Sequence, residues 1–178
     1  MRGRLIPISS RQELPLADVN SITADSRGTI YCASVYYARI QHYDSDGAFL
    51  DGWFVETSGG TFALRVNEFE EVEAFVERGD RLLTFDRAGR LVRSLQIARN
   101  DIGLFDGLVV RIEGGMLTLK YRFLAPRVVK TDVSGNSTVL MSTSFPKWLL
   151  LGPFPAFGFF FIGLFLWPIT RNSPPFVK

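Results

Sequence analysis

The stretch ADSRGTIYCASVYYARIQHYDSDGAFLDGWF, residues Ala24 to Phe54, decides the fold. It alternates short runs of β-branched and aromatic residues with two tetrads that carry Asp first and Gly fourth. Asp bonds the backbone of a turn and Gly supplies a positive φ, so each tetrad predicts a tight reversal of the chain. The stretch therefore predicts antiparallel strands joined by tight turns.

The second of these tetrads recurs twice further along the chain. The three copies begin at Asp44, Asp86 and Asp132, and their glycines are Gly47, Gly89 and Gly135. We predict that these six residues form structural turns. The aspartates are 42 and then 46 residues apart, close to the length of one four-stranded propeller blade.

Runs of strand-forming residues surround each tetrad, so each repeat is expected to hold four short antiparallel strands. The strands before the tetrads are Arg39–Tyr43, Arg81–Phe85 and Arg127–Thr131, and those after them begin at Phe49, Leu91 and Val139. Each repeat also has two earlier strands. They are Val19–Ala24 and Thr29–Ala33 in the first repeat, Phe62–Val66 and Val72–Val76 in the second, and Leu108–Ile112 and Met116–Tyr121 in the third. The sequence predicts a mainly β protein of three four-stranded, propeller-blade-like units.

The first unit resembles an NHL-type β-propeller repeat. The matching pieces are Asp25-Ser26-Arg27-Gly28 before an Ile-Tyr strand, Arg39-Ile40 opening the next strand, and an aromatic-Asp-x-x-Gly turn before Phe49-Leu50. The second unit keeps only the latter half of this pattern, and the third keeps little of it. The resemblance implies blade structure and a role as a binding platform. Enzymes of the family build metal sites from several histidines, and this chain has one, His42.

Three units are fewer than a closed propeller holds, since closed rings generally have four to eight blades. An array of three therefore leaves two outer sheet faces uncovered, and the ends of repeat arrays need capping. Two copies could pair, a partner could cover the ends, or the sheets could pack as an open sandwich or barrel. We expect an open or partner-completed array.

An apolar segment follows the repeats. The 22 residues Trp148–Ile169 contain no charged side chain, and about 20 apolar residues span a bilayer core. Lys147, Trp148, Trp167 and Arg171 are predicted to lie at the two membrane interfaces, because indole rings and flanking cations favour the headgroup region. We predict one transmembrane helix within residues 145–170.

The predicted helix has features that suit packing against other helices. Gly152, Ala156, Gly158 and Gly163 allow close approach of a second helix. Pro153 and Pro155 remove backbone donors, and the carbonyls they leave unpaired need shielding inside the bilayer. We expect other membrane-protein subunits, or further copies of the chain, to supply that contact.

The sequence divides into four parts. We assign 1–17 to an N-terminal extension, 18–144 to the soluble β-repeat domain, 145–170 to the anchor and 171–178 to a short tail. No apolar run of secretory-signal length follows the first cations. We expect the β domain in the cytoplasm and the tail on the opposite side of the membrane.

Charge and composition argue against several functions. The 18 acidic residues are matched by 18 Lys and Arg through Lys147, so the β domain is formally neutral and no nucleic-acid partner is expected. Cys32 is the only cysteine and His42 the only histidine, which excludes disulfides and metal sites of several Cys or His within the chain. We read Cys32 as a small buried residue and His42 as a half-exposed strand residue. No catalytic, cofactor or metal site is predicted.

Two local patterns have competing readings. Asp44-Ser45-Asp46-Gly47 looks like part of a calcium loop but lacks the later ligands, so a hairpin turn is favoured. The acidic run Glu68–Glu77 could form an amphipathic helix, but its alternation favours a half-exposed strand.

The leading hypothesis is therefore a non-catalytic accessory or scaffold subunit of a membrane protein complex. The alternative is a membrane-tethered ligand-binding or sensor domain. An enzyme is the third possibility and is not expected, because no catalytic constellation is recognisable.

Overall fold

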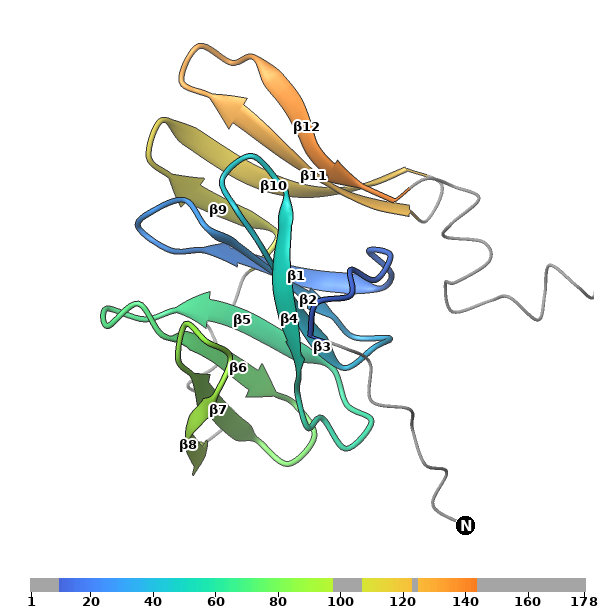
Figure 1. The fold of residues 1–178 in the computed structure, drawn as a ribbon, viewed down its shortest axis with the longest axis vertical. Coiled ribbons are helices and arrows are strands. Elements are labelled where there is room, and N and C mark those ends of the chain that lie inside the picture. Colours follow the sequence, from blue (N-terminus) through green and yellow to red (C-terminus); the bar gives the residue numbers. More distant parts are fainter. Residues whose placement is uncertain (1–9, 98–106, 123–124, 144–178) are drawn as a thin grey trace, which may run out of the picture.

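The computed structural model describes residues 10–97, 107–122 and 125–143, which form twelve β-strands (Figure 1). The strands are β1 (Val19–Ala24), β2 (Ile30–Ser34), β3 (Arg39–Tyr43), β4 (Phe49–Phe54), β5 (Phe62–Val66), β6 (Val72–Val76), β7 (Arg81–Phe85), β8 (Leu91–Gln96), β9 (Val109–Ile112), β10 (Gly115–Arg122), β11 (Ala125–Asp132) and β12 (Ser137–Ser142). The mainly β prediction is confirmed for the described residues.

The strands form three four-stranded antiparallel sheets, and each strand pairs with its neighbour in the chain. The first sheet holds β1–β4, the second β5–β8 and the third β9–β12. The predicted strands at Val19–Ala24, Phe62–Val66 and Val72–Val76 have the observed bounds. The acidic run is thus a strand from Val72 onward, and a turn precedes it. All five residues of this strand are buried, so the expectation of a half-exposed strand is wrong; Glu73 is buried in ion pairs with Arg65 and Arg93.

The first sheet lies between the other two (Figure 1). Its strand β1 contacts β5 on one side and β9 on the other, so the sheets fan out from their first strands as propeller blades do. The third sheet packs on the first and not on the second, which precedes it in the chain. The described residues therefore form an open arc with two end sheets.

Two apolar cores hold the arc together. One joins the first and second sheets through Tyr31, Ile40, Phe62 and other buried residues. The other joins the first and third sheets through Ile30, Tyr43 and Leu117 among others. All five residues of β2 are buried, because both faces of the middle sheet are covered.

A strap formed by Ser10–Ala17 crosses the first sheet and ends beside the third. The amide of Gly52 donates to Ser10 O (2.9 Å) and that of Leu14 to Gln41 Oε1 (2.8 Å). The amide of Leu16 donates to Thr143 Oγ1 at 2.7 Å, immediately after β12. The strap thereby ties the first sheet to the last strand.

The predicted anchor lies outside the described residues. The interface residues Lys147, Trp148, Trp167 and Arg171 and the packing residues Gly152, Ala156, Gly158 and Gly163 lie there too. In the ranges that the structure describes, no helix has the length and apolar character needed to cross a membrane.

Candidate functional site

The hairpin turns that join the first strand of each sheet to the second, and the third strand to the fourth, lie at one end of the arc, which we call the turn rim (Figure 1). Five of these turns share one hydrogen-bond pattern: a side-chain oxygen of the first residue accepts from the amides two and four positions later. The first residues are Asp25, Asp44, Asn67, Asp86 and Asp132. The rim is therefore a repeated Asx-turn surface.

The fourth residue of each turn has positive φ. Gly47, Gly89 and Gly135 lie at φ 85°, 74° and 86°, as the turn prediction requires. Glu70 takes the same place after Asn67 with φ 61°, a conformation that is costly for a residue with a side chain. The Asn67 turn begins 42 residues after the Asp25 turn, and that spacing would have revealed it from the sequence.

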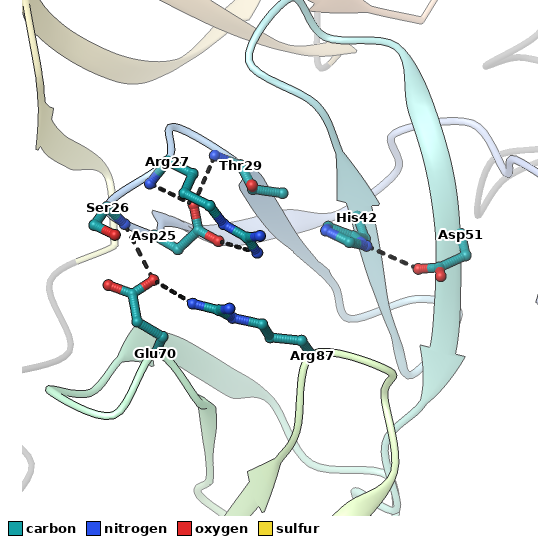
Figure 2. Close-up of polar contacts among 8 residues, drawn as sticks. All are labelled: Asp25, Ser26, Arg27, Thr29, His42, Asp51, Glu70 and Arg87. Carbon is teal, nitrogen blue, oxygen red and sulfur yellow. Dashed lines mark hydrogen bonds and ion pairs between the residues drawn. The ribbon is translucent and has the colours of Figure 1, made fainter.

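Glu70 forms a bridge between the first and second sheets (Figure 2). Its Oε2 accepts from the backbone amide of Ser26 at 3.3 Å and pairs with the Arg87 guanidinium at 3.3 Å. One carboxylate therefore joins three turns from two sheets. The left-handed conformation of Glu70 places this carboxylate at the junction, and we call these three residues the rim bridge.

A second ion pair lies beside the rim bridge. The carboxylate of Asp25 is buried and accepts from the amides of Arg27 and Thr29. The Arg27 guanidinium, which is largely exposed, contacts the same carboxylate at 3.4 Å. Because this carboxylate accepts hydrogen bonds from the backbone of its own turn, Asp25 has a structural role here.

Aromatic rings lie beneath these charges, on the face of the first sheet that packs on the second. Tyr31 is buried, and its ring stacks on His42 with centroids 4.7 Å apart. Trp53 meets both rings edge-on. Burial, and next the Asp25 carboxylate, raise the pKa of Tyr31 to about 12, so the phenol stays protonated at neutral pH.

His42 is half-buried, as predicted, and its Nδ1 lies 2.9 Å from Asp51 Oδ1 (Figure 2). A histidine that acts as a general base needs a nucleophile or substrate proton within reach of its other nitrogen. The neighbouring groups described for this ring are the aromatic rings of Tyr31 and Trp53. This arrangement fixes the imidazole by stacking.

Cys32 is buried in the core between the first and third sheets, as predicted. Burial raises the pKa of its thiol to about 12, so the reactive thiolate is scarce at neutral pH. Within the described ranges, no group of three or more His, Cys, Asp or Glu side chains is placed to hold a metal ion.

A groove of about 250 Å³ opens at the turn rim between the first and third sheets. Ile30 and Ile112 supply its apolar lining. Arg27, Lys130 and Glu113 bring charge to it, and the turns of the first sheet add serine hydroxyls. The groove thus combines cations, a carboxylate and an apolar surface.

No protein-family model matches the chain, and no curated protein matches its sequence. Among solved structures, a streptogramin B lyase shares 13% identity at a TM-score of 0.42, covering 74% of this chain and 43% of that chain. A virginiamycin B lyase from Staphylococcus aureus shares 12% identity at a TM-score of 0.39, covering 67% of this chain and 39% of that chain. A putative exported protein from Bacteroides fragilis shares 12% identity at a TM-score of 0.40, covering 78% of this chain and 42% of that chain.

The chain spans about two fifths of the length of these solved structures. The lyase activity named for two of them is theirs, and likenesses this distant say nothing about catalysis in this chain. The class that the fold defines is thus a three-sheet, propeller-like β protein.

Proposed function

We propose that this chain is a non-catalytic accessory or scaffold subunit of a membrane protein complex. In this proposal the three sheets are NHL-type blades that bind a partner, and Trp148–Ile169 spans the membrane once. The β domain faces the cytoplasm. Helix partners pack on Gly152, Ala156, Gly158 and Gly163.

The exposed strand β8 carries the proposal. β8 is the last strand of an end sheet, and all six of its residues are exposed. Leu91, Val92 and Leu95 are 56%, 53% and 44% exposed. An exposed edge strand with apolar side chains is a ready template for another chain. A partner strand that pairs with β8 would satisfy its backbone and cover these three side chains.

The chemistry of the turn rim supports a non-catalytic role. The five Asx side chains bond the backbone of their own turns, and Glu70 is engaged by Ser26 and Arg87. These polar groups therefore stabilise the fold and have little capacity left for a substrate.

Site-specific photocrosslinking in native membranes tests this proposal. A photoreactive amino acid replaces Leu95 on β8 or, as a matched control, Leu50 on β4; these leucines are 44% and 48% exposed. We expect one defined partner to crosslink at position 95 and much less at position 50. Equal crosslinking to many proteins at both positions would refute a docking role for β8.

A second candidate function is a membrane-tethered ligand-binding or sensor domain, and the groove between the first and third sheets favours it. Arg27 of the first sheet and Lys130 and Glu113 of the third sheet line a space of about 250 Å³. Such a site suits a small anionic or zwitterionic molecule. A ligand that raises the melting temperature of the wild-type chain but not of a Lys130→Ala variant would support this candidate.

A further inference from the structure

The outer face of the third sheet differs from the outer face of the second sheet at the other end of the arc. Leu117, Leu119 and Val128 point toward the first sheet and are buried there. Since side chains alternate along a strand, their chain neighbours project to the opposite face. Antiparallel pairing places Lys120 beside Arg127, and Arg111 beside Met116, on that outer face.

The outer face is cationic, and its described side chains include no acid. Among the residues whose side chains the structure describes, its charged residues are Arg111, Lys120 and Arg127, and the other positions on this face are apolar residues or Ser and Thr. None of the ion pairs found among the described residues includes these three cations. The face therefore presents three charges without a counterion among the described residues.

The other end sheet shows the contrast. On the outer face of the second sheet, Glu73 pairs with Arg65 at 2.6 Å and with Arg93 at 3.6 Å. The arginines of that face are thus compensated within the sheet. The third sheet is also the basic part of the arc, because residues 107–143 hold five Lys and Arg against two Asp and Glu.

Apolar side chains lie between the cations. Val109, Met116 and Val139 are 52%, 41% and 48% exposed on the same face. A surface of cations and apolar side chains matches the boundary of a bilayer, where anionic phosphates lie above the acyl chains.

The predicted membrane segment follows the third sheet closely in the sequence. β12 ends at Ser142, and Ser142 lies in register with Arg127, which is in turn opposite Lys120. Trp148 follows six residues later, a reach of at most about 22 Å. Two of the three cations therefore lie at the end of the sheet from which the anchor departs.

We propose that the outer face of the third sheet docks on the anionic surface of the bilayer in which the chain is anchored. Arg111, Lys120 and Arg127 contact lipid phosphates, and the apolar side chains between them enter the headgroup region. A second copy of the same face would bring like charges together, which disfavours symmetric self-pairing there. The inference rests on the proposed membrane attachment and adds an orientation of the sheets against the lipid.

Thiol accessibility of the full chain in nanodiscs tests the inference. The only native cysteine, Cys32, is buried, so an introduced cysteine reports its own position. Val139→Cys probes the outer face, and Leu50→Cys on β4 is a control of equal exposure, 48% in both cases. Labelling by a charged maleimide is compared in discs of phosphatidylcholine with and without phosphatidylserine.

Each cation near an anionic surface favours the docked state about fivefold. We therefore expect phosphatidylserine to slow labelling of Val139→Cys by about tenfold or more and to leave Leu50→Cys unchanged. Molar salt should reverse the protection, since it shortens the Debye length to about 3 Å. Neutralising the face with Arg111→Gln, Lys120→Gln and Arg127→Gln should abolish it.

Three results would overturn the inference. The first is a labelling rate of Val139→Cys that is the same with and without phosphatidylserine, and the second is protection that persists in the triple variant. The third is protection that increases with protein concentration, which would indicate contact with another copy of the chain. Retention of the chain in the discs after an alkaline wash is scored separately. Its loss would refute the anchor of the proposed function, whereas retention without protection would refute only the docked face.

Discussion

Replacing Gly89 with alanine tests how the turn rim holds the first and second sheets together. Gly89 has φ 74°, and a Cβ there would lie 2.6 Å from two carbon atoms of the Trp53 indole. The backbone strain costs about 1–2 kcal/mol, and overpacking against the ring adds about 1–3 kcal/mol. We therefore expect Gly89→Ala to destabilise the fold by about 2–5 kcal/mol.

Gly135 provides a matched control at the same position of a like turn. Its φ is 86°, but a Cβ there meets nothing within 4 Å. Gly135→Ala should therefore lower the free energy of unfolding only by the cost of the backbone strain, about 1–2 kcal/mol. The difference between the two variants isolates the contact between the turn and Trp53.

Urea unfolding of the full chain in mild detergent, followed by circular dichroism, measures both variants. A Trp53→Leu change should relieve the clash, so its combination with Gly89→Ala should cost less than the two single changes added together. Equal destabilisation by Gly89→Ala and Gly135→Ala, with additive behaviour of Trp53→Leu, would refute the packing of this turn against the first sheet.

Three further predictions concern titration, the turns and the anchor. Because burial raises the folded-state pKa of Cys32 to about 12 from 9.0, the unfolded chain loses this proton first, and stability should fall between these pH values by up to about 1.4 kcal/mol per pH unit. Cys32→Ala should make that loss shallower in unfolding measured against pH, and an unchanged slope would contradict the burial. Asn67→Ala removes the acceptor for two amides and should lower the unfolding free energy by about 1–2 kcal/mol, whereas no change in urea denaturation would show that the turn does not need its side chain. Truncation after Ser144 should release the chain from membranes under carbonate, and a truncated form that stays in the pellet would disprove the anchor.

Local chemistry explains what the sequence could predict. The Asp-x-x-Gly tetrads at Asp44, Asp86 and Asp132 define turns by backbone geometry alone, and strands such as Val72–Val76 follow from the residues between them. The Asn67 turn was missed because Glu70 stands where the other four turns carry glycine. Its recognition requires comparing positions 42 residues apart.

The order of the sheets in space could not be predicted. The third sheet packs on the first through Leu117 and Val128, which meet Ile30 and Tyr43 in one core. Such pairings depend on contacts between residues far apart in the chain, and local propensity carries no information about them. The contacts of Glu70 with Ser26 and Arg87 could not be predicted from the sequence for the same reason.

The central claim is that the chain works as an anchored subunit bound to other chains. The protein mass of the assembly, extracted in mild detergent and measured by light scattering with the detergent subtracted, tests it most directly. We predict a mass well above the 20.0 kDa of one chain, and a decrease toward that value for a Leu95→Lys variant but not for Leu50→Lys. A stable wild-type protein of 20.0 kDa, free of any partner, would contradict it.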